Sequence, residues 1–188
     1  MENKIRNIIN EGCGVKKSLA DQAALIQAMA DTIIDSLKKG GKLIVFGNGG
    51  SAADSQHFAA ELVGRFVKEK KPLPAISLSS NVSTLTALVN DYGGKEVFSK
   101  QLEALGENGD IAFAISTSGN SANVIHALAA ARQKGLKTVG LSGKGGGELA
   151  KAADMCLVVP SNTTARIQEA HITVIHILCE LIEDAFTE

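Results

Sequence analysis

A chain of 188 residues has the size of one ordinary domain and would be short for two. Its 19 basic and 20 acidic side chains leave a formal charge of -1, so no long-range positive field is available to attract nucleic-acid backbones or anionic membranes. Six Phe, one Tyr and no Trp leave few rings on which unstacked bases could lie. With 45% hydrophobic residues the chain can bury a sizeable core, which excludes a disordered protein.

The amino-terminal residues and the cysteines point to a compartment. The first ten residues, MENKIRNIIN, interleave charged and amide side chains and lack the continuous apolar stretch of a secretion signal. No later segment approaches the length of a membrane span. Cys13, Cys156 and Cys179 are widely spaced and form no CxxC pair, so neither a disulfide framework nor a thiolate zinc site is indicated. We expect a reduced, cytoplasmic protein in which all three are small buried hydrophobes.

The residues up to about Lys39 carry the spacing of an amphipathic helical segment. Apolar side chains recur at intervals of three and four residues, and the pattern stops at Gly40 and Gly41. The recurring residues are Leu25, Ile26, Met29, Ile33, Ile34 and Leu37. Residues 1–39 are therefore predicted to be helical.

Five short apolar runs of strand length follow. They are LIVF at 43–46, AISL at 75–78, IAFAIS at 111–116, TVGLS at 138–142 and MCLVV at 155–159. Their residues are apolar in succession, as in strands covered on both faces, and helical patterns separate them. This order predicts an α/β fold with a doubly wound, five-stranded parallel sheet flanked by helices, in a single domain over 1–188. A long helix is predicted from about Thr163.

The first predicted strand runs into a glycine-rich loop. In an open sheet of this kind, ligands bind beyond the carboxyl ends of the strands. The glycines of the loop allow close backbone approach, and the next helix begins at once; the loop consists of Gly47, Asn48, Gly49, Gly50 and Ser51. It has neither the Lys of a Walker loop nor the GxGxxG spacing of a dinucleotide site, so a nucleotide is disfavoured. A tight corner without a ligand is the alternative.

The third predicted strand ends in a loop of hydroxyl side chains. Ser116, Thr117, Ser118 and Ser121 surround Gly119, and a helix follows. The positive end of the helix dipole and the free backbone donors there favour an anion. Capping needs only one hydroxyl, so we favour a phosphate over capping alone. Without a cluster of Arg, the loop suits a monophosphate on a neutral organic body.

Candidate acids, bases and metal ligands lie on two predicted helices. His57 and Glu61 are four residues apart and share one helical face, where they could hold a divalent metal or share a proton. The terminal helix carries Gln168 and His176, and the apolar neighbours of His176 would draw it inside the assembly. A core histidine without a functional role is the alternative for His176.

Three further polar residues are interpreted with less emphasis on function. Asn90 and Asp91 precede Tyr92 and two glycines, so we interpret them as a turn first and as a hydroxyl-binding pair second. His126 has no recognisable partner in the sequence and is interpreted as structural.

Four segments together resemble the phosphoheptose isomerases, also called sedoheptulose 7-phosphate isomerases, of the sugar isomerase (SIS) fold family. The segments are FGNGGSAADSQHFAAELVGRF, NDYG, ISTSGNSANVI and TARIQEAHITVIHIL, and the likeness covers nearly the whole chain. The loop that carries Ser116, Thr117, Ser118 and Ser121, called the serine loop below, would alone indicate only a sugar-phosphate-binding SIS domain. The HFAAEL and RIQE segments, with His176, narrow the resemblance to the heptose enzymes.

The resemblance implies an activity and a site. The activity is the aldose–ketose conversion of sedoheptulose 7-phosphate to D-glycero-D-manno-heptose 7-phosphate through an enediol, the first step toward the heptose of lipopolysaccharide or related surface glycans. Glu61 would be the catalytic base, with His176 opposite it. One partially occupied zinc per subunit would be held by His57, Glu61, Gln168 and His176. The implied substrate-binding residues are Asn48, Gly49, Gly50, Ser51, Glu61, Asn90, Asp91, Ser116, Thr117, Ser118, Ser121 and Gln168.

The chemistry can also be argued without the resemblance. Moving a carbonyl between C2 and C1 requires a base that takes a proton from carbon, and an acid or metal near the two oxygens. A carboxylate and an imidazole suffice, while a distant phosphate anchors the substrate. No nucleotide or redox cofactor is expected. Glutamine is an unusual zinc ligand, and about 12 Å of helical rise separates Gln168 from His176. If different subunits contributed the ligands, Gln168 and His176 of one chain would not have to reach the same ion.

The sequence also bears on the assembly of the protein, and it leaves two alternative functions open. The resemblance implies a homotetramer with active sites at subunit contacts, and the amphipathic helices at both ends of the chain suit packing between protomers. The expected partner is a small sugar phosphate, without nucleic acid or membrane. Two alternatives stay open: a non-catalytic SIS protein of the replication-initiator-binding type, and an isomerase of another sugar phosphate. Proteins of the first type lack the acid–base pair that this chain retains in Glu61 and His176.

Overall fold

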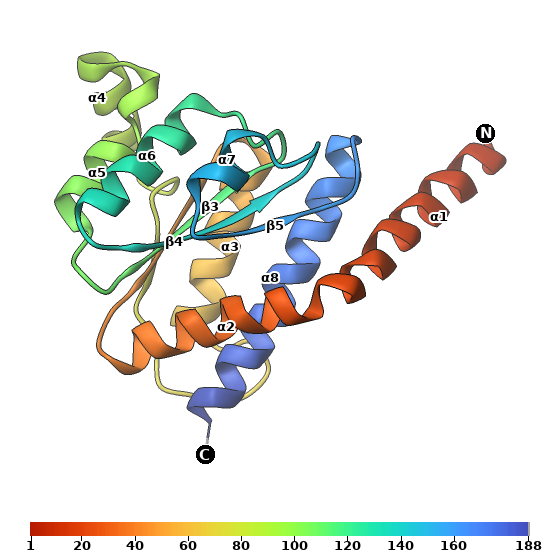
Figure 1. Cartoon of the computed structure of the whole chain (residues 1–188), viewed down its shortest axis with the longest axis horizontal. Helices are drawn as coiled ribbons and strands as arrows, with labels where there is room; N and C mark the ends of the chain where they lie inside the picture. The colour runs from red at the N-terminus through yellow and green to blue at the C-terminus, as the bar shows by residue number, and fades with distance from the viewer. Residues whose placement is uncertain (188) are drawn as a thin grey trace.

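A computed structural model describes residues 1–187 of the chain (Figure 1). Five parallel strands form one sheet in the order β2-β1-β3-β4-β5. The strands are β1 (Leu43–Gly47), β2 (Ala75–Ser77), β3 (Ile111–Ser116), β4 (Lys137–Ser142) and β5 (Met155–Val158). All five coincide with the predicted runs to within a residue at each end. The predicted fold class is confirmed.

The two faces of the sheet belong to two separate apolar clusters. Successive residues of a strand point to opposite faces, so Val45 and Phe113 enter one cluster while Phe46 and Ala114 enter the other. The central strand β3 is buried along its whole length. This explains why the strands are apolar in succession rather than in alternation.

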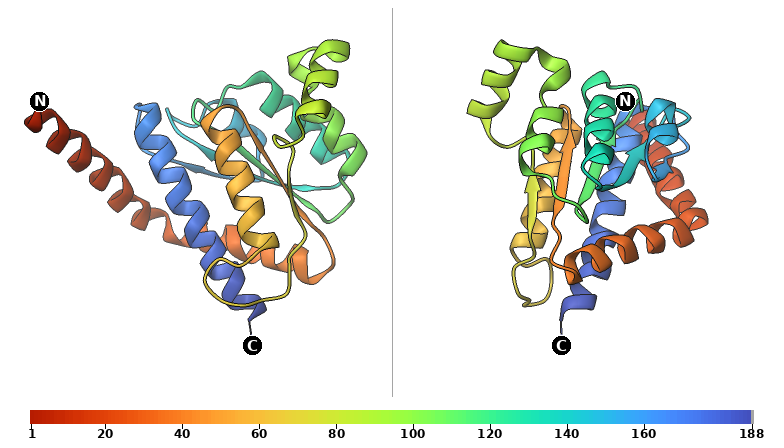
Figure 2. Two further views of the ribbon diagram at one scale, coloured as in Figure 1. Left: turned by 180° about the vertical axis from the view of Figure 1, so that it is seen from behind. Right: turned by 60° about the vertical axis from the view of Figure 1, so that its left-hand side comes forward.

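Helices cover both faces of the sheet (Figure 2). Helices α2, α3 and α8 supply the first cluster, where the ring of Phe58 packs edge-on against Phe113 at 5.2 Å. Helices α5, α6 and α7 lie on the other face. The helices are α1 (Glu2–Ser18), α2 (Ala23–Lys38), α3 (Gly50–Val63), α4 (Val82–Tyr92), α5 (Ser99–Leu105), α6 (Ala122–Gln133), α7 (Gly147–Ala152) and α8 (Thr164–Phe186), with short 3-10 turns η1 (Leu19–Gln22) and η2 (Gly94–Glu96).

The winding of the chain reverses between β1 and β3, which are neighbours in the sheet. Helix α3 leads from β1 to β2 on one face, whereas α6 leads from β3 to β4 on the other. The two connections therefore diverge beyond the carboxyl ends of these strands. A crevice at such a point is the usual ligand site of open α/β sheets.

The predicted amino-terminal helical segment consists of two helices joined by η1. It ends at Lys38, followed by Gly40 with φ of 88°. Helix α1 projects from the body of the molecule (Figures 1 and 2), and Gly12 is its one buried residue. Ile5, Ile8 and Ile9 on α1 are exposed by 52%, 43% and 57%. No helix within residues 1–187 combines the length and apolarity that crossing a bilayer would need.

Two expectations about burial are wrong in part. Strand β2 lies at the sheet edge and buries Ser77 while leaving Ile76 exposed, so it is not covered on both faces. Among the cysteines, Cys179 is buried, Cys156 is half-buried and Cys13 is exposed on α1. Cys13 is exposed because α1 contributes little to the core of a single chain.

Candidate active site

The glycine-rich loop after β1 lies at the reversal point of the sheet. Gly49 has φ of 56°, and α3 begins at Gly50. The amide of Asn48 forms a reciprocal pair with that of Asn123 on α6, with nitrogen–oxygen distances of 2.9 and 3.0 Å. Ser51 is buried in the first turn of α3. The loop is therefore tied to the helix that follows the serine loop.

The serine loop joins β3 to α6. Ser116 Oγ lies 3.0 Å from Ser121 Oγ, and Ser118 Oγ accepts a bond from the backbone N–H of Asn120 at 3.2 Å. Ser121 occupies the N-cap of α6, yet its side chain makes no capping bond to the described chain. Capping alone therefore does not account for the hydroxyls. Ser121 and the half-buried Thr117 and Ser118 remain partly open to a ligand at the amino end of α6.

The turn after β4 closes tightly on the serine loop. Gly119 has φ of 65°, and a Cβ there would collide with the backbone of Gly146 and lie 2.7 Å from Ser142 Oγ. Asn120 Oδ1 also accepts the backbone N–H of Glu148 at 3.1 Å. This second turn was not predicted from the sequence, although the run GKGGGE after a predicted strand was a signal for it.

A cavity of about 310 Å³ opens beside the glycine-rich loop. Its polar groups come from Asn48, Gly49, Asn123 and Ser79, and its apolar ones come mainly from α4 and from Val97 and Phe98, which precede α5. Ser79 Oγ donates to the carbonyl of Gly47 at 2.9 Å. Ser79 and Asn123 were not predicted from the sequence. Both follow the rule that ligand groups lie beyond the carboxyl ends of strands, since Ser79 follows β2 and Asn123 follows the serine loop.

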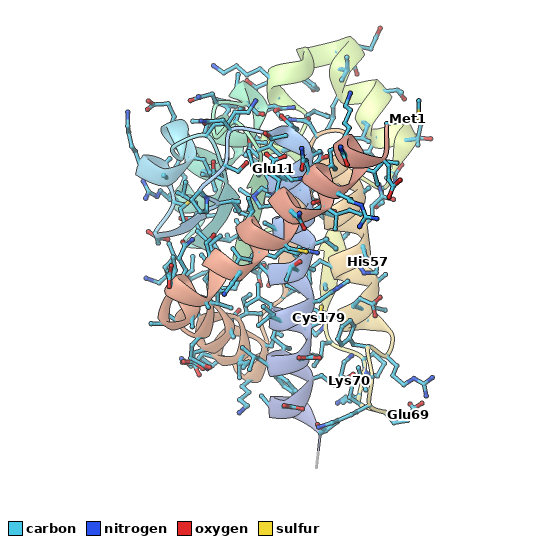
Figure 3. All side chains as sticks on the ribbon, turned by 90° about the vertical axis from the view of Figure 1, so that its right-hand side faces the viewer. Met1, Glu11, His57, Glu69, Lys70 and Cys179 are labelled. Atoms are coloured by element: carbon cyan, nitrogen blue, oxygen red, sulfur yellow. The ribbon has the colours of Figure 1, made fainter. Side chains whose placement is uncertain are left out.

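A cluster of titratable side chains lies where α3 and α8 pack side by side. His57 projects from α3 beside α8 (Figure 3), and its Nε2 lies 3.0 Å from Nε2 of His176. Glu61, one turn further along α3, places Oε1 3.5 Å from the same His57 nitrogen. The predicted acid and base, 115 residues apart in sequence, thus meet around one imidazole. Glu61 and His57 keep 21% and 42% of their side chains exposed, so a ligand can reach them.

Asp54 lies one turn before His57 on α3. Its carboxyl group is half-buried, and within residues 1–187 its Oδ2 has no hydrogen-bond partner. Burial raises the pKa of Asp54 to about 6, and the nearby His57 opposes part of that rise. This carboxylate was not singled out from the sequence.

Gln168 does not join the other three predicted zinc ligands. Its amide covers Gly50, where a Cβ would collide with it, at the amino end of α3. About 10 Å of helical rise separates Gly50 from His57, so Gln168 lies roughly two turns from the two histidines. Within one chain, Gln168 is therefore separate from His57, Glu61 and His176, and the predicted set of four would need ligands from more than one subunit. His171 is nearer to Gln168 in the sequence than His176 is. Its Nε2 lies 3.1 Å from the carbonyl oxygen of Ser142, and burial lowers the pKa of its imidazole to about 4.

The remaining three residues fit a zinc ion only in part. Zinc–nitrogen bonds of about 2.1 Å in a tetrahedral site place two ligand nitrogens about 3.4 Å apart. The observed separations of 3.0 Å for the two imidazoles and 3.5 Å for His57 and Glu61 lie on either side of that value. Among residues 1–187, however, no group of three His, Cys, Asp or Glu side chains forms a metal site. One chain offers two convergent imidazoles and a carboxylate beside one of them.

Three other predicted residues are placed outside this cluster. Asn90 and Asp91 are exposed in the last turn of α4, where the amide of Asn90 donates to Asp91 at 2.8 Å, so they are helical and not a turn. The turn begins at Gly93, with φ of 85°. His126, interpreted as structural, has a partner that the sequence did not reveal: its Nε2 lies 3.0 Å from the carboxylate of Glu96.

Comparison with known proteins identifies the family. Residues 13–143 match the SIS domain family. A protein of Rhodospirillum rubrum named phosphoheptose isomerase is 51% identical over 98% of this chain and 98% of its own length. The chain belongs to the phosphoheptose isomerase family. Two solved phosphoheptose isomerases share its fold: the Neisseria gonorrhoeae enzyme with TM-score 0.92 and 41% identity over 97% and 98% of the two chains, and the Francisella tularensis enzyme with 0.93 and 38% over 97% of each.

The resemblance seen in the sequence is thus confirmed at the level of the phosphoheptose isomerase family. Each comparison covers almost all of this chain and of the relative. The region compared therefore includes the serine loop, the α3–α8 cluster and the projecting α1.

Proposed function

We propose that this protein isomerises sedoheptulose 7-phosphate to D-glycero-D-manno-heptose 7-phosphate through an enediol, as a step toward the heptose of surface glycans such as lipopolysaccharide. The observation that carries the proposal is the meeting of Glu61 and His176 around His57. A chain about half identical to named phosphoheptose isomerases supports the choice of substrate. A non-catalytic binding protein would have no need of an accessible carboxylate beside two imidazoles.

The two ends of the substrate meet different kinds of group. The phosphate binds at the amino end of α6, to the hydroxyls of Ser116, Thr117, Ser118 and Ser121 and to backbone N–H groups. Glu61 takes the proton from the carbon beside the carbonyl, and His176 exchanges a proton with the oxygens of the enediol. Asn48, Gly49, Asn123 and Ser79 contact the sugar hydroxyls in the adjoining cavity.

The phosphate end and the acid–base pair of one chain do not serve one substrate molecule. Helix α3 begins at the glycine-rich loop, next to the serine loop, and Glu61 lies eleven residues further along. That distance is about 16 Å of helical rise. We therefore propose that Glu61 and His176 of one copy complete the phosphate site of another copy, in a homotetramer.

Two apolar surfaces support an assembly of several copies. One is the exposed row of Ile5, Ile8 and Ile9 on α1. The other is a hollow of about 510 Å³ between η1, α2 and α8, lined mainly by apolar side chains such as Leu19, Ile26, Ile177 and Leu181. Exposed apolar surfaces of this kind are typical of protein–protein contacts.

Zinc binding is part of the proposal. His57 and His176 would supply two nitrogens and Glu61 an oxygen, and a glutamine such as Gln168 could complete the set only from another chain. A bound zinc would polarise the substrate carbonyl.

We also propose a reducing, cytoplasmic setting, because all three cysteines are unpaired thiols in the described chain.

The reaction is tested with the purified protein and sedoheptulose 7-phosphate in deuterium oxide, followed by NMR. We expect an aldose 7-phosphate that carries deuterium at C2, because a proton held by Glu61 exchanges with solvent before it returns. Metal analysis before and after dialysis against a chelator, with turnover measured on both samples, tests zinc. Deuterium at C2 could not arise from a hydride shift, and the absence of any product would contradict the proposed substrate.

Sharing of sites between copies is tested by mixing two inactive variants. Glu61→Gln removes the base and Gly119→Ala distorts the serine loop, so each homogeneous assembly should be nearly inactive. Unfolding and refolding them together should restore measurable turnover, because some mixed sites combine an intact loop with an intact Glu61. Mixed samples as inactive as their parents would show that each site lies within one chain.

A further inference from the structure

The imidazole of His176 is flanked by two rings. His57 lies on one side, with ring centroids 5.2 Å apart and planes at 66°. The ring of Phe66 lies 5.5 Å away, with planes at 39°. Phe66 does not belong to α8 or to α3. It lies in the loop that follows α3, so the placement of its ring depends on what fixes that loop.

A carboxylate from α8 fixes this loop. Glu183 lies two turns beyond His176 on the same helix and is 1% exposed. Its two oxygens accept three consecutive backbone N–H groups, from Phe66 at 3.1 Å, from Val67 at 3.0 and 3.2 Å, and from Lys68 at 2.8 Å. Successive N–H groups that converge in this way form an anion-binding concavity.

The charge of Glu183 is matched to these donors. Burial alone would raise the pKa of its carboxyl group, but the N–H bonds from residues 66–68 outweigh burial, and the pKa lies below its usual range. The carboxylate is therefore ionised at neutral pH, when its bonds to the loop are strongest.

A second charged side chain holds the other end of the loop. Lys70 Nζ donates to the carbonyls of Leu62 and Gly64, at 2.6 and 2.7 Å, at the carboxyl end of α3. A cation there also suits the negative end of the helix dipole. Residues 64–70 are thus tied to both helices that carry the acid–base cluster, to α3 through Lys70 and to α8 through Glu183.

We propose that Glu183 is a positioning residue for His176: it holds the backbone of residues 66–68, and thereby keeps the Phe66 ring against the imidazole and fixes the direction of its Nε2. The inference deepens the proposed function, because it assumes that His176 exchanges protons with the substrate. Glu183 itself contacts no substrate. A purely structural role for Glu183 would stabilise the fold without any effect on the His176 ring.

The test is a double-mutant cycle on Glu183→Gln and Phe66→Leu. Glutamine keeps one acceptor oxygen and loses the charge, whereas leucine keeps an apolar side chain and loses the flat ring. We expect each change to lower kcat about tenfold with KM nearly unchanged, a smaller loss than the roughly 100-fold that a 1 Å misplacement can cost. The double variant should be no slower than either single variant, because both act through one contact.

The matched control is Asp184→Asn. Asp184 is the next residue on α8 and pairs with Lys68 of the same loop at 2.6 Å, but both side chains are more than half exposed. A solvent-exposed pair of this kind contributes little. This variant should leave kcat as it is.

A second readout needs no substrate. In protein labelled at histidine, NMR signals of the His176 ring should broaden or shift in Glu183→Gln and in Phe66→Leu, and stay in place in Asp184→Asn. If the kcat losses multiply in the double variant, or if the His176 signals stay unchanged while thermal stability falls, Glu183 is only structural. If the unsubstituted protein fails to isomerise the sugar, the reaction proposal fails, and the ring signals still decide the positioning role.

Discussion

The serine loop and the α3–α8 cluster solve different problems with different parts of the chain. The serine loop is local: four hydroxyls within six residues surround the amino end of α6, and the sheet fixes their position. The cluster is assembled from distant pieces, with His57 and Glu61 on α3 and His176 on α8. The proposed anion site is thus made from neighbouring residues of one loop, whereas the proposed acid–base site depends on how two helices pack.

The largest expected effect separates the two regions by kinetics. Glu61→Gln removes the base without touching the serine loop, so kcat should fall by about 10²- to 10⁴-fold while KM changes little. Steady-state kinetics with sedoheptulose 7-phosphate measures both. Glu180→Gln, an exposed residue one turn after His176, serves as the control and should behave like the unsubstituted protein. Full turnover by Glu61→Gln would remove Glu61 from the chemistry.

A smaller effect is expected at the other end of the substrate. Gly119→Ala brings a Cβ into the backbone of Gly146, at a residue with φ of 65°. The loop must shift, and kcat/KM should fall on the order of 100-fold through weaker phosphate binding. Inorganic phosphate binding, measured by calorimetry, should weaken in parallel. Gly145→Ala is the control, because it has φ of 80° but open space around its Cβ, so it carries the backbone strain without the collision.

The smallest expected effect concerns stability and Asp54. The folded state raises the pKa of this carboxyl from 3.8 to about 6, so it holds the proton more tightly than the unfolded chain does. The free energy of unfolding therefore decreases as pH rises from about 4 to 6, and the penalty is complete above that range. Asp54→Asn should be more stable at pH 7 by about 1–2 kcal/mol, allowing for partial solvent access, and equal at pH 4.

Denaturant unfolding at the two pH values measures this difference, with the exposed Asp35→Asn as control. Equal stability of the Asp54 variant and the unsubstituted protein at pH 7 would mean that the assembled protein supplies a donor to Asp54. That result would sharpen the contrast between the two regions, because the cluster on α3 would then depend on another copy.

The fold was predictable from the sequence because its signals are local. Strand-length apolar runs such as IAFAIS became β3 without change, and Gly40 marked the end of the first helical segment. The serine loop was predictable for the same reason, since its hydroxyls are neighbours in the chain. The edge position of β2, which leaves Ile76 exposed, was not, because strand order depends on which crossovers pack on which face.

The cluster was predictable only as a set of candidates. Helical spacing paired His57 with Glu61, but the choice of His176 needed the resemblance, and the structure separates Gln168 from the set. No local pattern indicated that Glu183 would accept N–H groups 115 to 117 residues earlier in the chain. Such contacts are set by the crossing of α3 and α8, which depends on all the apolar residues between them.

The reversal of winding between β1 and β3 sets a boundary on what substitutions can change. Two connections leave these neighbouring strands toward opposite faces, and the hollow beside Asn48 lies where they diverge. Exchanging the side chains that line the hollow would alter which molecule it admits, whereas its place at the carboxyl ends of the strands is set by the topology. The lining side chains thus set the chemical selectivity of the site, and the order of the strands sets its position.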